Sequence, residues 1–266
     1  MELPEKLRVN LKDEILFGET TGIPTGGRPI QIGLDDLSPR PTQGFECIDG
    51  LDLFRANKLM VDVFVPFSIY RGNEPKTSYG VAKNTDFLQK LKICQRISGS
   101  TLKYHVHGYH HSASRNNANH EFFECTPSTI KLTLQALKTD IEKVEREGID
   151  FHHGPDKDKL CFRPPGWKIN QAAVDLLQEF DYTHLSLLER YKDEGEYDLD
   201  FGDLTLHWCN AAPPDVEFPK DKTTPLSVTY HAATWLNNNL DLNNALGLLT
   251  EASNSEILLP FSVINL

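Results

Sequence analysis

A cluster of histidines gives this sequence its clearest potential for metal chemistry. The segment His107–His111 (HGYHH) follows an apolar segment and places its outer imidazoles four residues apart. If the chain becomes helical after Gly108, that spacing brings both rings to one face, where they can share an ion. Neutral imidazole binds zinc, iron, cobalt and nickel alike. A histidine-rich surface turn is the competing interpretation, because His105, His110 and His120 lie nearby and cannot all be ligands. The density of the cluster favours a metal site.

Two adjacent carboxylates, Asp35 and Asp36, follow the apolar segment 29–34 (PIQIGL). Successive side chains of a strand point to opposite faces, so one carboxylate could bind a metal while its neighbour acts as a base. An aspartate that caps a helix or closes a turn after a strand is the competing interpretation. The pair alone is therefore weaker evidence than the histidine cluster.

The loop Arg163–Trp167 (RPPGW) follows the apolar residues LCF. Its two prolines restrict the backbone, Gly166 allows a close backbone approach, and Arg163 offers a planar guanidinium that matches a carboxylate. A rigid turn with a solvent-facing arginine would explain the same residues.

Two further histidines end apolar segments. His207 ends DLTLH and His231 ends LSVTYH. Either could be a general acid, because imidazole titrates near neutral pH. Each could equally be a core histidine with a satisfied hydrogen bond.

Short apolar segments alternate with amphipathic helical patterns along most of the chain. Strands are predicted at 29–34, 60–69, 102–109, 160–164, 183–188, 203–208, 226–232 and 257–264. Helices are predicted at about 127–147, 170–180 and 241–252, with Thr126, Asn170 and Asp241 as N-caps and Gly148 after the first helix. This alternation predicts an α/β domain with a parallel sheet, either open and doubly wound or closed into a (β/α) barrel. In both architectures polar residues at the C-terminal ends of strands converge.

Composition narrows the function classes. The 266 residues are 39% hydrophobic and 24% charged, which fits one large α/β domain or two small ones. The formal charge is −11 and there is no basic run, so nucleic acid is not an expected partner. No signal peptide or apolar stretch of membrane-spanning length is visible, which predicts a cytoplasmic protein without a membrane partner. Five scattered cysteines indicate reduced thiols rather than disulfides or zinc ligands. Oligomeric state is left open.

Taken in order, the aspartate pair, His107-x-x-x-His111, Arg163-Pro-Pro and His231 resemble the motifs of the polysaccharide deacetylase superfamily, carbohydrate esterase family four. The likeness is strongest to a divergent branch with motifs HGYxH, EFF and PPxW, which match His107–His111, Glu121–Phe123 and Pro164–Trp167. It covers about residues 29–264. The resemblance implies a single catalytic domain over residues 1–266, folded as a distorted (β/α)7 TIM-like barrel.

The sequence departs from the family at four places. Leu37 stands where the family usually has Gly after the aspartate pair, and Gly108 where it has Ser or Thr. The segment Pro165-Gly166-Trp167 replaces Pro-Tyr-Gly. No segment matches the fourth motif, which usually supplies an Asp near a Trp. Sugar specificity is therefore not carried over.

The resemblance implies a metal site formed by Asp36, His107 and His111. The expected cofactor is a divalent metal, most often Zn²⁺, with Co²⁺, Fe²⁺ and Ni²⁺ as alternatives.

Roles for other residues also follow from the resemblance. Asp35 would be the general base, Arg163 would hold its carboxylate, and His231 would be the general acid. Substrate contacts are expected from Pro165, Gly166, Trp167 and His207.

The implied reaction removes an acyl group, usually acetyl, from an N-acetylated carbohydrate or a related amide, so the expected partner is a small-molecule or oligosaccharide substrate. A metal-dependent hydrolase of a non-sugar amide or ester would use the same residues. A catalytically silent carbohydrate-binding protein on the same barrel is the alternative from a different class.

Overall fold

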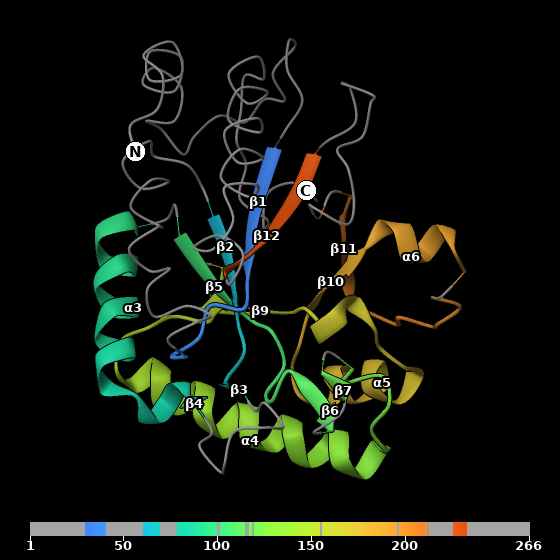
Figure 1. The fold of residues 1–266 in the computed structure, drawn as a ribbon, viewed down its shortest axis with the longest axis horizontal. Helices are drawn as coiled ribbons and strands as arrows, with labels where there is room; N and C mark the ends of the chain where they lie inside the picture. Colours follow the sequence, from blue (N-terminus) through green and yellow to red (C-terminus); the bar gives the residue numbers. More distant parts are fainter. Residues whose placement is uncertain are drawn as a thin grey trace.

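The computed structural model describes residues 30–40, 61–69, 79–99, 102–114, 117–118, 120–154, 156–195, 197–210, 212 and 226–232 (Figure 1). The helix predicted at 241–252 and the strand predicted at 257–264 lie outside the described residues.

Seven parallel strands form the main sheet, in the order β11-β10-β9-β5-β2-β1-β12. Their bounds are β1 (Ile30–Asp35), β2 (Val61–Val65), β5 (Leu102–Val106), β9 (Lys159–Phe162), β10 (His184–Leu188), β11 (Thr205–Cys209) and β12 (Leu226–His231). An eighth strand, β8 (His152–His153), pairs antiparallel with β9. Two small hairpins stand apart: β3 (Ser68–Ile69) with β4 (Tyr79–Gly80), and β6 (Ser112–Ser114) with β7 (Asn117–Ala118).

The two end strands of this sheet meet, so that the sheet curls into a nearly closed barrel. The backbone N–H of Asn210, just after β11, donates to the carbonyl of Ser227 in β12 at 3.1 Å. The N–H of Ser227 donates in return to the side-chain oxygen of Asn210 at 2.9 Å. The sequence left an open sheet and a barrel as alternatives. The structure confirms the (β/α)7 barrel.

Helices fill the connections between the parallel strands and pack outside the sheet (Figure 1). They are α3 (Thr85–Ser98), α4 (Pro127–Arg146), α5 (Gln171–Glu179) and α6 (Glu189–Asp193), with 3₁₀ turns η2 (Val81–Lys83) and η4 (Pro165–Trp167). None of the helices in the described part of the chain is long and apolar enough to cross a membrane.

Two of the three predicted N-caps are confirmed, and the third, Asp241, lies outside the described residues. Thr126 accepts the N–H of Thr129 at 3.4 Å at the start of α4, and Asn170 accepts the N–H of Ala173 at 2.9 Å at the start of α5. Gly148 follows α4 with a φ of 86°, the left-handed conformation that favours glycine. The sequence analysis missed α3.

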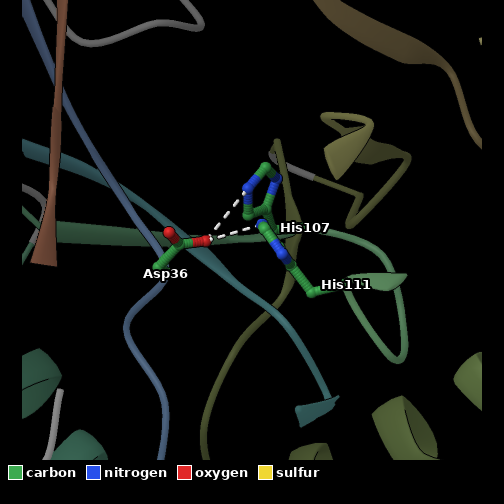
Figure 2. A group of neighbouring side chains, drawn as sticks. All are labelled: Asp36, His107 and His111. Atoms are coloured by element: carbon green, nitrogen blue, oxygen red, sulfur yellow. Dashed lines mark ion pairs between the residues drawn. The ribbon is translucent and has the colours of Figure 1, made fainter. Parts of the chain in front are cut away.

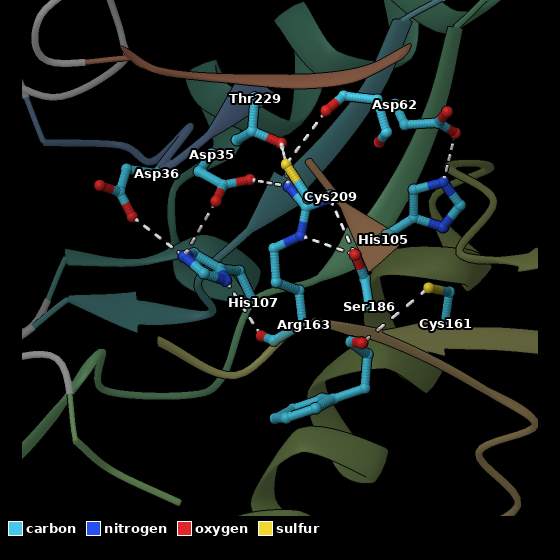
Figure 3. A network of polar contacts seen from close by, with 12 residues as sticks. Asp35, Asp36, Asp62, His105, His107, Cys161, Arg163, Ser186, Cys209 and Thr229 are labelled. Atoms are coloured by element: carbon cyan, nitrogen blue, oxygen red, sulfur yellow. Dashed lines mark hydrogen bonds and ion pairs between the residues drawn. The ribbon is translucent and has the colours of Figure 1, made fainter. Parts of the chain in front are cut away.

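The two faces of the barrel strands pack in different ways. One face of β2 and β5 is apolar and packs against the helices; the hydroxyl of Tyr104, for example, donates to the Leu91 carbonyl of α3 at 2.9 Å. The other face points into the barrel and is polar. Arg163 follows β9, yet it contacts Asp35 of β1 and Thr229 of β12, which only the interior of a closed sheet allows (Figure 3). The apolar layer stabilises the fold by burial, at about 25 cal/mol per Å², while the interior holds buried polar side chains.

Candidate metal centre

Asp36, His107 and His111 meet at the C-terminal ends of β1 and β5 (Figure 2). The Oδ1 atom of Asp36 lies 2.9 Å from Nε2 of His111 and 3.3 Å from Nε2 of His107. One ligand atom from each residue lies within 4.8 Å of the other two. These side chains are 71 and 75 residues apart in sequence (107 − 36 and 111 − 36), and the sheet register brings them together. They form a candidate metal-binding triad, as the resemblance predicted.

The surroundings of the triad fit a cation. His107 places Nδ1 3.0 Å from the carbonyl oxygen of Arg163, which can only accept, so Nδ1 carries the proton. In the neutral form of the ring, which is the form that binds a metal, the Nε2 lone pair faces Asp36. Oδ1 of Asp36 is buried. The lone pair and the carboxylate oxygen repel each other at this distance unless a positive charge, either a proton on Nε2 or a divalent ion, lies between them.

The charges around the triad favour positive charge at this site. Burial by itself would raise the pKa of Asp36, but the imidazoles of His111 and His107 hold that pKa well below its usual range. Burial would lower the pKa of His111, and the Asp36 carboxylate outweighs it and raises that pKa. Asp36 is thus an anionic ligand at neutral pH.

The segment that carries the two histidine ligands is a turn, which corrects the helix expected after Gly108. Gly108 has a φ of 70° and His111 a φ of 59°, both outside helical geometry. A β-carbon on Gly108 would lie 2.6 Å from Oε2 of Glu121 and 2.6 Å from Cγ of Pro165. Glycine is therefore required here for its conformation and for its size.

The side chain of Glu121 fixes this turn by accepting hydrogen bonds from the backbone of the turn. Its carboxylate accepts the N–H groups of Tyr109 at 2.8 Å, His110 at 2.9 Å and His111 at 3.2 Å. Burial raises the pKa of Glu121, although the N–H groups of His110 and Tyr109 favour its ionised form. The glutamate of the EFF segment thus packs against the glycine of HGYHH. Sequence reasoning quoted this segment without assigning it a role.

Asp35 and Asp36 both face the site, although alternation along a strand would turn one away. Asp36 has a φ of 68°, so the chain leaves the strand geometry directly after Asp35. Oδ1 of Asp35 accepts from the Arg163 guanidinium at 2.6 Å. Its Oδ2 lies 3.9 Å from Nε2 of His107 and has no hydrogen-bond partner among the described residues (Figure 3). One oxygen of Asp35 is held, and the other is available beside the triad.

Arg163 is buried inside the barrel with a relative exposure of 1%. Its Nε and Nη2 donate to the hydroxyl of Ser186 at 3.1 and 2.9 Å, and its Nη1 also donates to Thr229 at 3.0 Å (Figure 3). The guanidinium lies over the ring of Phe64, 3.5 Å from its centroid. The contact predicted between Arg163 and Asp35 is present, and it compensates a charge that would be costly to bury alone.

A pocket of about 290 Å³ opens onto the triad. Asp35, Gly166, Trp167 and His231, four residues that the sequence placed at the site, line it. Its other described lining residues, beside the triad, are His120, Leu188, Arg190, Tyr191 and Ala212. Pro165 is buried and packs against Gly108 instead of lining the pocket.

His207 lies elsewhere. The sequence put it at the end of a strand, but β11 continues to Cys209, so His207 falls in the middle of the strand. Its ring is buried, stacks on His184 at 5.2 Å, and is not among the described residues that line the pocket. His152 and His153 form β8; His152 pairs with Glu145 and His153 contacts the Tyr104 carbonyl.

Comparison with known proteins identifies the fold alone. No protein-family model matches the chain, and no curated protein matches it. A solved structure, the 4-alpha-glucanotransferase from Thermococcus litoralis, aligns with a TM-score of 0.54 and 10% identity. The alignment covers 89% of this chain, which spans about 40% of the length of that protein. At this identity the likeness supports the barrel and leaves the resemblance to the deacetylases untested.

Proposed function

We propose that this protein is a metal-dependent hydrolase that removes an acyl group from an amide, with an N-acetylated carbohydrate or a related amide as substrate. The observation that carries the proposal is the candidate triad with a second carboxylate beside it. Asp36, His107 and His111 offer three ligand atoms within 4.8 Å of one another, and the Oδ2 of Asp35 lies 3.9 Å from the nearest imidazole nitrogen.

Asp36, His107 and His111 would hold the ion. A divalent metal bound there supplies a Lewis acid for the acyl oxygen and lowers the pKa of a water towards about 7. The free Oδ2 of Asp35 is placed to take a proton from the attacking water. Arg163 keeps the other oxygen of Asp35 in one orientation and keeps the carboxylate compensated inside a buried site.

His231 is the acid that the resemblance predicts, and its place in the pocket wall is compatible with that role. It ends β12, in register with Asp35 of β1. An imidazolium there could protonate the leaving amine, which departs poorly as an anion. Gly166 and Trp167 line the pocket as well and are the proposed substrate contacts.

Glycosyl transfer, the activity named for the structural neighbour, would commonly require one carboxylic acid that keeps its proton and one carboxylate. The two carboxyl groups that line the pocket in the described residues suit this less well. Asp35 pairs with Arg163, and the pKa of Asp36 is well below its usual range, against the effect of burial, because of His111 and His107. Amide hydrolysis with a bound metal uses both groups in their ionised forms.

The test is a comparison of the apoprotein, prepared with a chelator, with protein reloaded separately with Zn²⁺, Co²⁺, Fe²⁺ or Ni²⁺. Each preparation is given acetanilide, p-nitrophenyl acetate and a panel of soluble N-acetyl sugars, and acetate release is measured. We expect turnover to require the metal. Release from acetanilide but from no sugar would place the protein among hydrolases of non-sugar amides. Metal binding without any acetate release would contradict the hydrolase.

The alternative of a silent carbohydrate-binding protein predicts a different pattern. Isothermal titration would then detect sugar binding, while acetate release would be absent with every metal. The ionised pair of Asp35 and Arg163 favours the enzyme, because a binding protein has no need for a carboxylate oxygen without a donor beside the triad.

A further inference from the structure

A second imidazole of the pocket has a carboxylate partner. His120 lines the same pocket as the triad, and its Nδ1 lies 2.9 Å from Oε1 of Glu124. The carboxylate oxygen of Glu124 accepts this hydrogen bond, so Nδ1 of His120 carries the proton. The contact fixes the ring orientation and leaves Nε2 as the nitrogen available to another group. A carboxylate that orients an imidazole in this way is the arrangement used in proton-transfer catalysis.

His120 reaches the pocket from a different part of the fold than His231 does. It belongs to the connection after β5, whereas His231 ends β12, and β2 and β1 separate these strands in the sheet. The chain next to His120 is fixed to the metal site, because the adjacent Glu121 accepts three N–H groups of the turn 109–111. The position of His120 relative to the triad is therefore set by buried hydrogen bonds rather than by its own exposed ion pair.

The ion pair contributes little to the fold. The side chains of His120 and Glu124 are 29% and 40% exposed, and pairs of this exposure have small effects on stability. A chemical role explains a fixed imidazole on the pocket wall better than a structural role does.

We propose that His120, oriented by Glu124, donates the proton to the leaving group in place of His231, the acid that the resemblance predicts. The proposal rests on the hydrolase function proposed above. In this step water oxygen bonds to the acyl carbon and a water proton passes to Asp35. The carbon–nitrogen bond then breaks with its electron pair on nitrogen, and the Nε2 proton of the His120 imidazolium passes to that nitrogen. The neutral imidazole regains a proton from solvent. His120 is the catalytic residue, and Glu124 is a positioning residue.

The experiment uses two substrates that differ in their need for an acid. Acetanilide must lose a protonated amine, whereas p-nitrophenyl acetate loses a stable phenolate. His120→Gln should lower kcat/KM for acetanilide by about 10²- to 10⁴-fold, the usual contribution of general acid catalysis. Turnover of p-nitrophenyl acetate and metal content should change little. Glu124→Gln should give a smaller loss with the same dependence on leaving group.

His152→Gln is the matched control. His152 pairs with Glu145 at 2.7 Å and has the same 29% side-chain exposure as His120, but it does not line the pocket in the described residues. It should leave both reactions unchanged. A readout independent of turnover is the protonated Nδ1 of His120 in nitrogen-15 spectra, assigned by its absence in His120→Gln, which Glu124→Gln should shift.

The outcomes separate this proposal from the function on which it rests. Equal losses on both substrates, or no loss on acetanilide, would overturn the role of His120 while the wild-type hydrolase stands. Wild-type protein with full metal content that hydrolyses neither substrate would overturn both.

Discussion

Two groups of histidines in one barrel have opposite environments. The pocket histidines, His107, His111, His120 and His231, line the cavity at the C-terminal ends of the strands. The inner histidines, His105, His153, His184 and His207, are not among the described residues that line this cavity. The rings of His105 and His153 are 4.9 Å apart, those of His184 and His207 are 5.2 Å apart, and His105 pairs with Asp62 at 2.6 Å.

The difference lies in whether carboxylates or burial dominate. Asp36 beside His111 outweighs the effect of burial and raises its pKa. Burial, aided by His184, lowers the pKa of His207 to about 3, and burial, aided by His105, lowers that of His153 to about 3. The same residue type thus favours positive charge beside a carboxylate, at His111, and stays neutral where burial dominates, at His207 and His153.

The largest expected effect is that variants of the triad lose the metal, whereas a variant of the inner group keeps it. Replacing a triad residue, as in Asp36→Ala, His107→Ala or His111→Ala, should greatly weaken metal binding. The loss should far exceed the ~10- to 100-fold that is typical when a residue that hydrogen-bonds to a metal ligand is replaced. His184→Asn, in the inner group, should retain the ion. Elemental analysis after desalting measures both. Metal retention in the three pocket variants would remove the distinction between the two groups.

Asp35→Asn should separate chemistry from metal binding. The amide cannot take a proton from water, so turnover should fall by about 10²- to 10⁴-fold while the metal content stays near that of wild type. The change also leaves the buried Arg163 guanidinium without its anionic partner, which typically costs about 3–5 kcal/mol. Urea unfolding therefore accompanies the assay, and a folded, fully active variant would show that Asp35 is not the base.

Gly108→Ala tests whether crowding shapes the pocket group. The new methyl group would clash with Glu121 and Pro165, and alanine also disfavours the positive φ at this position. We therefore expect the free energy of unfolding to fall by about 2–5 kcal/mol and metal binding to weaken. Gly99→Ala is the matched control, since Gly99 has a φ of 58° and a β-carbon added there would meet no atom of the described residues within 4 Å. It should cost about 1–3 kcal/mol, because only the backbone conformation of Gly99 (φ 58°, ψ −130°) opposes a side chain there. Equal unfolding free energies for both variants would argue against crowding.

The inner group should also make the stability of the fold depend on pH. His207 and His153 have a pKa of about 3 in the folded chain and about 6.5 when unfolded, so only the unfolded chain binds their protons in between. Stability should therefore fall as pH drops from 6.5 towards 3, by at most about 1.4 kcal/mol per pH unit for each residue. Urea unfolding of His207→Asn should show a shallower slope below pH 6.5. If the slope is unchanged, His207 does not contribute to the pH dependence of stability.

Local sequence patterns predict most of the described strands and helices, and which polar residues could meet. The apolar stripe of α4, its cap at Thr126 and the glycine at 148 are local signals, and the structure agrees with them within two residues. The strand ends at Asp35 and His107 were also readable, because a parallel sheet collects such ends at one edge. Closure of the barrel was not, since it depends on contacts between Asn210 and Ser227 that no local pattern encodes.

Only the tertiary structure decided how each polar residue is used. The spacing of His107 and His111 suggested a helix, but the close packing of Gly108 against Glu121 and Pro165 selects a turn. His207 and His231 gave equivalent sequence signals, yet two further residues of β11 bury the first, while the second reaches the pocket. Burial and neighbouring charge arise from segments far apart in the chain, and they are what distinguishes a candidate ligand or acid from a neutral core histidine.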